Sequence, residues 1–338
     1  MKISVCVIAL NEEENIKDLF SDLEKQDFPH EEIEIVLVDG NSDDNTRQLM
    51  VDFQTNAVGF GKIIVLDNPK KIQASGWNIA IKASSGELIL RIDAHARIPS
   101  DFVRKSVECI ESGEDVCGGR RINIIKGETA KDQLLLLAEN SMFGSGIAPY
   151  RHVQKKQYVK TLAHACYRRD VFEKAGLFNE NILRAEDNEL HYRIRQAGYR
   201  FCLSNEITSE YLTRNSLSGM LRQKYGNGKW VGLTAKSFTP KIFSFYHFVP
   251  FLFVLGLIGG IFFSFVPILS PVLWWFVLPL GALLGMYFLV DIVLTVSCVV
   301  NSRKWYSLLL FFIFPLLHIS YGWGTLIGLF HAKVESVS

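Results

Sequence analysis

The sequence lacks both glycine-rich phosphate-binding patterns, Gly-x-Gly-x-x-Gly and Gly-x-x-x-x-Gly-Lys-Ser/Thr. Dinucleotide-binding folds and phosphate-loop NTPases rest their phosphates on glycine backbone, so this absence argues against both classes. A nucleotidyltransferase would show a glycine-rich, basic loop after its first strand, whereas this chain has Asn11-Glu12-Glu13-Glu14. A phosphate group would therefore meet the carboxylates of this chain through a metal ion, since two anions repel.

Paired cysteines are also absent, because none of the six cysteines belongs to a Cys-x-x-Cys pattern. We expect reduced thiols, which fits a catalytic part in the cytoplasm. The formal net charge is only +1, so nothing favours nucleic acid as a partner. Residues 1–10 have no small-residue cleavage site and run into an acidic segment. We therefore expect a buried first strand and not a signal peptide.

Formal charges almost disappear between residues 245 and 330, where Asp291, Arg303 and Lys304 alone remain. A run of about 20 apolar residues is long enough to cross a bilayer. The shift in composition predicts a catalytic domain (1–213), a basic interfacial helix or linker (214–244), a transmembrane region of about three apolar segments (245–331) and a short tail (332–338).

The apolar segments are Tyr246–Ile268, Val272–Val300 and Trp305–Phe330. Lysines precede the first, and Arg303 and Lys304 lie between the second and third. The positive-inside rule predicts a multi-pass protein of the inner (cytoplasmic) membrane, with its catalytic domain in the cytoplasm and its C-terminus outside. The third segment, with its prolines and glycines, also fits a re-entrant or interfacial hairpin. Asp291 is expected to face a protein partner or a cavity, or to reach the interface from a helix end.

Strands and helices alternate along the first hundred residues. We expect strands at residues 3–10, 34–38, 62–66 and 87–93, with helices after each of the first three. Asn11 is expected to cap the first helix with Glu14 as its reciprocal partner. Another helix is expected from Asn45 or Thr46, and the next around Gln73–Ala83. This order predicts a parallel, doubly wound α/β sheet.

Two of the expected strands end in acidic residues, Asp39 and Asp93. The carboxyl ends of parallel strands form one crevice, where open α/β sheets bind ligands. Asp39 can accept hydrogen bonds from a nucleobase or ribose, although it also fits a simple turn and helix cap with Ser42. Asp93 and His95 point to the same face and can hold a divalent cation against phosphates, although such triplets are usually polar surface.

A second acidic centre, Glu186-Asp187, precedes an expected helix. The pair fits helix capping, and it also fits a base that takes a proton from an acceptor hydroxyl. His164 and Cys166 suggest zinc, but no second pair is nearby, so a hydrogen-bonded histidine and a buried cysteine are favoured. The polar segment Asn140–Lys160 is a candidate lid over an acceptor.

This constellation resembles the inverting family-2 glycosyltransferases with the GT-A fold. The matching pieces follow the family's order over roughly residues 1–230: Ser4-Val5, Asn11-Glu12, Val38–Thr46, Gly76-Trp77-Asn78 with Ala80, Ser85-Gly86-Glu87, Asp93-Ala94-His95, Arg168-Arg169 through Gly176–Phe178, and Glu186-Asp187. The subgroup it most resembles is the membrane-anchored, succinoglycan-type enzymes of bacterial exopolysaccharide synthesis. The resemblance implies a Rossmann-like, mostly parallel catalytic domain followed by an all-α transmembrane region.

The resemblance also implies roles. Asp39 would contact the uracil or ribose of a UDP-sugar, and Asp93 would help place Mg²⁺ or Mn²⁺ beside His95, which stands where many members carry a second Asp. Asp187 would be the catalytic base, supported by Glu186. The full set expected to bind the nucleotide-sugar is Asn11, Glu12, Asp39, Ser42, Asp93, Arg168, Lys229 and Trp230.

Lys229 and Trp230 lie where processive members carry Gln-x-x-Arg-Trp. The spacing here differs and lysine replaces arginine, so no processivity is inferred. This stretch fits equally a site for diphosphate or sugar and a basic helix on the membrane surface.

The function expected from these features is inverting, metal-dependent transfer of a sugar from a UDP-sugar to a hydroxyl of a membrane lipid-linked saccharide. This would serve bacterial exopolysaccharide or cell-surface glycan synthesis. Two alternatives stay open. One is a polyprenyl-phosphate glycosyltransferase, which needs no base because its acceptor phosphate is already ionised. The other is a non-catalytic membrane scaffold with the same fold.

Overall fold

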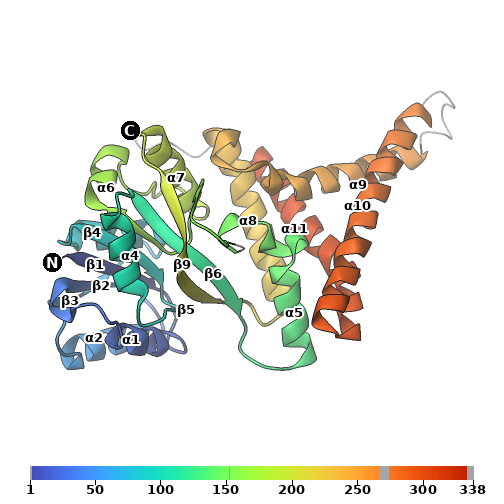
Figure 1. Ribbon diagram of the computed structural model, residues 1–338. Helices are drawn as coiled ribbons and strands as arrows, with labels where there is room; N and C mark the ends of the chain where they lie inside the picture. Colours follow the sequence, from blue (N-terminus) through green and yellow to red (C-terminus); the bar gives the residue numbers. More distant parts are fainter. Residues whose placement is uncertain (1, 152, 266–273, 333–338) are drawn as a thin grey trace. The chain divides into compact units, whose positions relative to one another are not determined.

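The computed structural model describes residues 2–151, 153–265 and 274–332, which form two compact units (Figure 1). The first unit comprises Met1–Ile124 and Ala148–Leu212, and the second comprises Ile125–Ile147 and Thr213–Glu335. The division after Leu212 lies beside the expected boundary at residue 213. The segment 125–147, which we had placed in the catalytic domain, belongs to the second unit.

The first four long strands form the parallel half of the sheet, as predicted. They are β1 (Ile3–Ala9), β2 (Ile33–Asp39), β3 (Lys62–Asp67) and β4 (Leu88–Asp93), in the order β3-β2-β1-β4. They are connected by helices α1 (Ile16–Glu24), α2 (Thr46–Asn56) and α3 (Gln73–Ala83), with the short helix η1 (His30–Glu32) before β2. The register pairs Ala9 with Asp39 and Ile8 with Asp93, so these strand ends lie side by side.

The other half of the sheet is mixed. Strand β8 (Ala165–Arg168) runs antiparallel between β4 and β6 (Val116–Ile124), and β6 pairs parallel with β9 (Phe201–Leu212). Two short strands, β5 (Ala96–Arg97) and β7 (Gln157–Val159), pair antiparallel with β9. The sheet is thus less parallel than expected, because β8 follows a long connection and not a crossover helix.

Helices cover both faces of this sheet (Figure 1). On one face Val5 and Val7 of β1 pack with α1, α2 and α4 (Phe102–Glu111). On the other face Cys6 of β1 packs with α3, α6 (Arg169–Ala175) and α7 (Glu186–Gln196). The near-continuous burial of β1 and β2 is what a doubly covered sheet requires.

The expected cap at Asn11 is wrong. Helix α1 begins at Ile16 with Asn15 before it, while Asn11 has a φ of 56°. Asparagine tolerates this left-handed conformation, which turns the chain away from β1 before the helix starts. The side chain of Asn11 instead accepts a hydrogen bond from the backbone of Asp43, so it joins two loops at the sheet edge.

The second unit is helical. Its elements are α5 (Ala130–Asn140), η2 (Met142–Gly146), α8 (Leu217–Ser237), η4 (Pro240–Ile242), η5 (Phe245–Phe248), α9 (Val249–Phe265), α10 (Trp274–Ser302), η8 (Trp305–Leu309) and α11 (Leu310–Phe330); η3 (Pro149–Arg151) belongs to the first unit. Within the described chain, Phe245–Phe262, Leu278–Ser302 and Trp305–Phe330 are long and apolar enough to cross a membrane. The expected spans overlap these segments, except where they fall on residues 266–273, outside the described residues.

Asp291 is fully buried inside this unit, where its Oδ1 accepts a hydrogen bond from Thr295 Oγ1 at 3.3 Å. It therefore does not reach an interface from a helix end. Segment Asn140–Lys160, the candidate lid, spans parts of both units and contains η2, η3 and β7.

Candidate active site

Asp39 closes β2 and orders the loop after it. Its Oδ2 accepts a hydrogen bond from the backbone N–H of Ser42 at 3.0 Å, which is the turn that the sequence suggested. Its Oδ1 is buried and has no hydrogen-bond partner among the residues that the structure describes. An unsatisfied buried carboxylate oxygen is costly, so a ligand N–H or O–H at this atom would stabilise it.

The loops after β1 and β2 are tied together by hydrogen bonds. The backbone N–H of Asn11 donates to Ser42 Oγ at 2.9 Å, and that of Glu12 donates to Thr46 Oγ1 at 2.8 Å. Because Asn11 also accepts from Asp43 at 2.8 Å, the two loops hold each other in place. The structure thus brings together Asn11, Glu12, Asp39 and Ser42, as expected for neighbouring strand ends.

Glu12 connects this loop pair to the end of β4. Its Oε1 lies 3.0 Å from His95 Nδ1. A carboxylate only accepts, so Nδ1 carries the proton that is donated to Glu12. The same ring packs edge-on against Tyr211, with ring centroids 4.9 Å apart. These two contacts orient the His95 ring, as outer-shell partners do for metal-binding histidines.

Asp93 has a histidine partner that the sequence did not reveal. His164 Nε2 lies 3.3 Å from Asp93 Oδ2, and its Nδ1 lies 2.9 Å from Ser209 Oγ. Burial favours a raised pKa for Asp93, but the hydrogen bond from His164 and the nearby charge of Arg91 hold this pKa well below its usual range. Asp93 is therefore ionised at neutral pH and accepts from His164, which in turn accepts from the Ser209 hydroxyl.

These contacts confirm the preferred interpretation of His164 and Cys166. His164 is buried and hydrogen-bonded, and Cys166 lies in the hydrophobic core. Burial also lowers the pKa of His164, which keeps the ring neutral. No zinc ligand set forms at this place in the described chain, where no group of three or more His, Cys, Asp or Glu side chains is arranged to hold a metal ion.

Glu186 and Asp187 lie in the first turn of α7, as predicted, where the helix macrodipole favours anions. Burial, followed by the charge of Asp187, raises the pKa of Glu186 to about 8. Burial also raises the pKa of Asp187, whose Oδ1 accepts from the backbone and side-chain N–H groups of Asn188 at 2.8 and 3.1 Å. Ala185 stands at the N-cap, so these acids do not serve as the cap itself.

Arg91 is a buried cation among these acids and was not among the predicted site residues. It precedes Asp93 by two residues on β4 and so shares its face. Its guanidinium carbon lies 4.4 Å from the ring centroid of Trp77 and 4.8 Å from that of Phe178. The charge of Arg91 lowers the pKa of Asp93 and of the Glu186–Asp187 pair. Side chains alternate between the two faces of β4, and this alternation could have identified Arg91 as a neighbour of Asp93 from the sequence.

Three of the residues expected to bind the donor are not part of the loops and strand ends described above. Arg168 pairs opposite Leu88 at the start of β4, about 16 Å of strand from Asp93, and forms an ion pair with Asp170. Because β8 runs antiparallel to β4, Arg168 lies at the opposite edge of the sheet from Asp93, and its assignment to donor binding stays a prediction. Lys229 and Trp230 lie on α8 in the second unit.

The donor chemistry of Asp93 and His95 suits a divalent cation. Mg²⁺ sites commonly use one or two protein ligands and leave the remaining positions to phosphates and water. An ionised Asp93 supplies a hard oxygen, and His95, oriented by Glu12, supplies a nitrogen that suits Mn²⁺.

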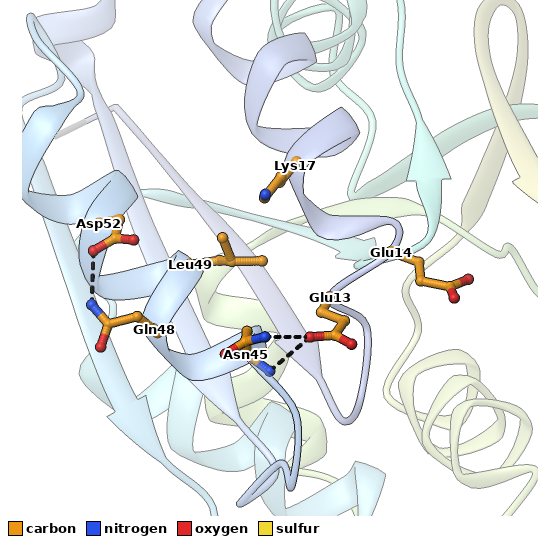
Figure 2. A pocket seen from close by; sticks show the side chains of 7 residues that line it. All are labelled: Glu13, Glu14, Lys17, Asn45, Gln48, Leu49 and Asp52. Atoms are coloured by element: carbon orange, nitrogen blue, oxygen red, sulfur yellow. Dashed lines mark hydrogen bonds between the residues drawn. The ribbon is translucent and has the colours of Figure 1, made fainter.

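A shallow surface hollow lies next to these loops but contains none of the site acids. Figure 2 shows its lining of Glu13, Glu14, Lys17, Asn45, Gln48, Leu49 and Asp52. Glu13 accepts from the backbone and side chain of Asn45 at 3.0 and 2.8 Å, and Gln48 donates to Asp52 at 2.8 Å. Glu13 is thus paired with Asn45, and Gln48 with Asp52, and the hollow has no assigned part in the chemistry.

Comparison with known proteins places this site in a family. The model for "Glycosyl transferase family 2" matches residues 4–176, more than half of the chain. The succinoglycan biosynthesis protein ExoA of Rhizobium meliloti (strain 1021) is 28% identical over 228 residues, which cover 67% of this chain and 67% of that protein. The Methanococcus voltae dolichyl N-acetyl-alpha-D-glucosaminyl phosphate 3-beta-D-2,3-diacetamido-2,3-dideoxy-beta-D-glucuronosyltransferase is 24% identical over 237 residues, covering 68% of this chain and 73% of that protein.

A solved structure is similar in fold. The crystal structure of S. aureus TarS 1-349 in complex with UDP superimposes with a TM-score of 0.50 at 22% identity, covering 68% of this chain and 65% of that chain. The matches thus span about two thirds of each relative's length. The likeness confirms the expected GT-A fold of the first unit, with a mixed sheet that contains parallel strands. By the extent of the family match, the chain belongs to glycosyltransferase family 2 and is a glycosyltransferase.

Proposed function

We propose that this enzyme transfers a sugar from a UDP-sugar to a hydroxyl of a membrane lipid-linked saccharide, with inversion at the anomeric carbon. The observation that carries the proposal is the continuous hydrogen-bonded edge from Asp39 through Asn11 and Glu12 to His95. That edge offers Asp39 as a hydrogen-bond acceptor for a nucleoside. It also offers Asp93 and His95 as ligands for a cation that binds the diphosphate. Family membership and the TarS structure with UDP support a nucleotide-linked donor.

The donor would be bound at two places along this edge. The buried Oδ1 of Asp39 would accept a hydrogen bond from the uracil or ribose. Asp93 and His95 would hold Mg²⁺ or Mn²⁺, which when bound offsets the charge of the diphosphate. His164 would act behind Asp93 as a positioning residue, because it fixes the orientation of the carboxylate without being a ligand itself.

Asp187 is proposed as the base, with Glu186 in support. Asp187 is half-buried whereas Glu186 is only 4% exposed, so Asp187 is the more accessible acid. Its raised pKa strengthens it as a proton acceptor, and the Arg91 charge keeps the pair from becoming wholly protonated. Asp187 would take the proton of the acceptor hydroxyl as the oxygen attacks the anomeric carbon from the side opposite the diphosphate.

The acceptor is proposed to be membrane-bound. The three apolar helices of the second unit and the printed names of the succinoglycan and dolichyl relatives support this assignment. The basic residues around Lys236, Lys241 and Arg303 support a catalytic unit on the cytoplasmic side of the inner membrane. Lys229 and Trp230 on α8 are kept as candidates for contact with diphosphate or sugar.

The test is UDP release by purified, detergent-solubilised protein, with Mn²⁺ or Mg²⁺, across a panel of UDP-sugars and with or without a membrane lipid extract. We expect metal-dependent release that needs one donor and the lipid and is lost in Asp187→Asn. Asp52→Asn, in the surface hollow, is the matched control and should keep activity. Full activity of Asp187→Asn with a polyprenyl phosphate would favour the polyprenyl-phosphate alternative. No release and no calorimetric UDP binding would favour the non-catalytic scaffold.

A further inference from the structure

Helix α11 is covered along one side by polar helices of its own unit. Its first half buries Leu310, Ile313, Phe314 and Leu317. These side chains pack against Leu134, Leu135 and Ala138 of α5 and Met220 of α8. The buried share of the α11 segment, 44%, exceeds the 22% and 11% of the two preceding apolar segments. A helix that faced lipid on all sides would not make these contacts.

The second half of α11 packs on α8 through glycines of both helices. A Cβ placed on Gly228 would lie 1.9 Å from the carbonyl oxygen of Tyr321, and one on Gly328 would lie 2.0 Å from that of Lys229. Such distances require direct backbone contact, as in small-xxx-small helix pairs. Gly232 and Gly324 make equally close approaches across the same interface.

The two helices run parallel over this contact. Ser320 Oγ donates to the Leu221 carbonyl at 2.7 Å, and Lys236 Nζ donates to the His331 carbonyl at 2.8 Å. Residues 221–236 of α8 therefore lie alongside residues 320–331 of α11, and the two segments run in the same direction. Whatever depth the second half of α11 takes in a membrane, α8 must take as well.

Helix α8 carries cations that do not suit the bilayer core. They are Arg222, Lys224, Lys229 and Lys236 within 21 residues. Lys224 forms an ion pair with Glu139 at 3.0 Å, whereas Arg222 and Lys236 are exposed. Charged side chains are expensive in the hydrocarbon and favourable among anionic lipid headgroups.

The uncovered side of α11 is apolar along its whole length. Exposed side chains recur at helical spacing: Leu309, Phe312, Leu316, Ile319, Trp323 and Phe330. One face is thus suited to acyl chains and the opposite face is packed on charged helices. This is the pattern of a helix that lies in the membrane interface.

The other two apolar helices meet α11 from one side. Gly322 of α11 touches Pro250 in the first turn of α9, and Cys298 near the end of α10 packs beside the start of α11. Farther along α9, Gly256 and Gly260 face Leu284 of α10. Helices α9 and α10 therefore form a hairpin. The beginning of α9 and the end of α10 both contact α11.

We infer that α11 lies in the interface with α8 and does not cross the bilayer, so Ala332 emerges on the same side as the first unit. The surface that α8 and α11 present fits an anionic lipid headgroup layer. In this arrangement α9 and α10 cross the membrane as a hairpin, and α11 does not make the third crossing that hydropathy predicts. It holds whether or not the enzyme transfers a sugar.

The test is cysteine accessibility in the full-length protein expressed in a bacterial membrane. Ala332→Cys is compared with Val58→Cys, on the exposed surface of the first unit, and Ser270→Cys, between α9 and α10. A membrane-impermeant maleimide is applied to sealed and to lysed spheroplasts, with the unsubstituted protein as background. We expect Ala332→Cys to give the sealed-to-lysed labelling ratio of Val58→Cys.

A ratio for Ala332→Cys that matches Ser270→Cys instead, with labelling already in sealed spheroplasts while Val58→Cys is labelled only after lysis, would overturn the inference. If the thiol at 332 reacts poorly even after lysis, a protease-cleavable tag placed after Ala332 gives the same readout. Cleavage only after lysis, as for labelling of Val58→Cys, supports the interfacial helix. Cleavage in sealed spheroplasts, where Val58→Cys stays unlabelled, contradicts it.

Discussion

Replacing His164 by phenylalanine removes the hydrogen-bond donor behind Asp93 while keeping a ring of similar shape in a buried site. Hydrogen bonds to charged groups contribute about 1.5–3 kcal/mol. The Nε2 to Oδ2 distance of 3.3 Å is longer than in strong charge-assisted pairs, so we take about 1.5 kcal/mol. This corresponds to about tenfold weaker binding of UDP with Mn²⁺, if Asp93 holds the cation.

The same change should raise the pKa of Asp93, because the ionised carboxylate loses the hydrogen bond from His164. The pKa of Asp93 is depressed in the folded state, so its ionised form stabilises the fold above its unfolded pKa and loses this effect as the pH falls. His164→Phe should therefore lower the free energy of unfolding at pH 7. The difference from wild type should shrink below the unfolded pKa of about 3.9.

Calorimetric titration with UDP and Mn²⁺ measures the first effect. His164→Gln, whose amide can still donate to Asp93, should restore most of the affinity. His191→Phe is the matched control, since His191 is equally buried but is bonded to Thr161 and Tyr167. Wild-type affinity in His164→Phe, or an equal loss in His191→Phe, would refute the positioning role.

Three further outcomes follow from the geometry. Glu186→Gln replaces an acid that is protonated near neutral pH, so the acidic limb of the kcat–pH profile should stay in place, and a limb that moves to lower pH would show that Glu186 is ionised beside Asp187. Gly228→Leu should sharply reduce thermal stability in detergent because its side chain meets a carbonyl of α11, whereas Gly281→Leu, with nothing within 4 Å, should not. Glu12→Ala should weaken Mn²⁺ affinity about 10–100-fold by releasing the imidazole that it orients, measured by paramagnetic resonance of free Mn²⁺.

The parallel half of the fold was predictable because its signals are local. Apolar runs ending in Asp39 and Asp93 give β2 and β4, and helix α3 begins and ends at the predicted Gln73 and Ala83. The gathering of Asn11, Ser42 and Asp39 follows from the rule that neighbouring parallel strands end at one edge. Only the backbone at Asn11 differed, because a left-handed residue leaves little trace in sequence.

The contacts that were missed are non-local. His164 meets Asp93 across 71 positions, and only the antiparallel placement of β8 beside β4 makes this possible. The same placement puts Arg168 at the far edge, where sequence order alone had grouped it with the donor site. The glycine pairing of α8 with α11 likewise needs both helices in view, since neither Gly228 nor Gly324 indicates its partner.

The most direct test of the central claim is transfer of labelled sugar from its UDP donor into the lipid fraction of a membrane extract. Wild-type protein and Asp52→Asn should transfer sugar in the presence of Mn²⁺ or Mg²⁺. Asp187→Asn should bind UDP with unchanged affinity and transfer none. Transfer by Asp187→Asn at the wild-type rate, or transfer by wild type that does not depend on the UDP-sugar, would contradict the account.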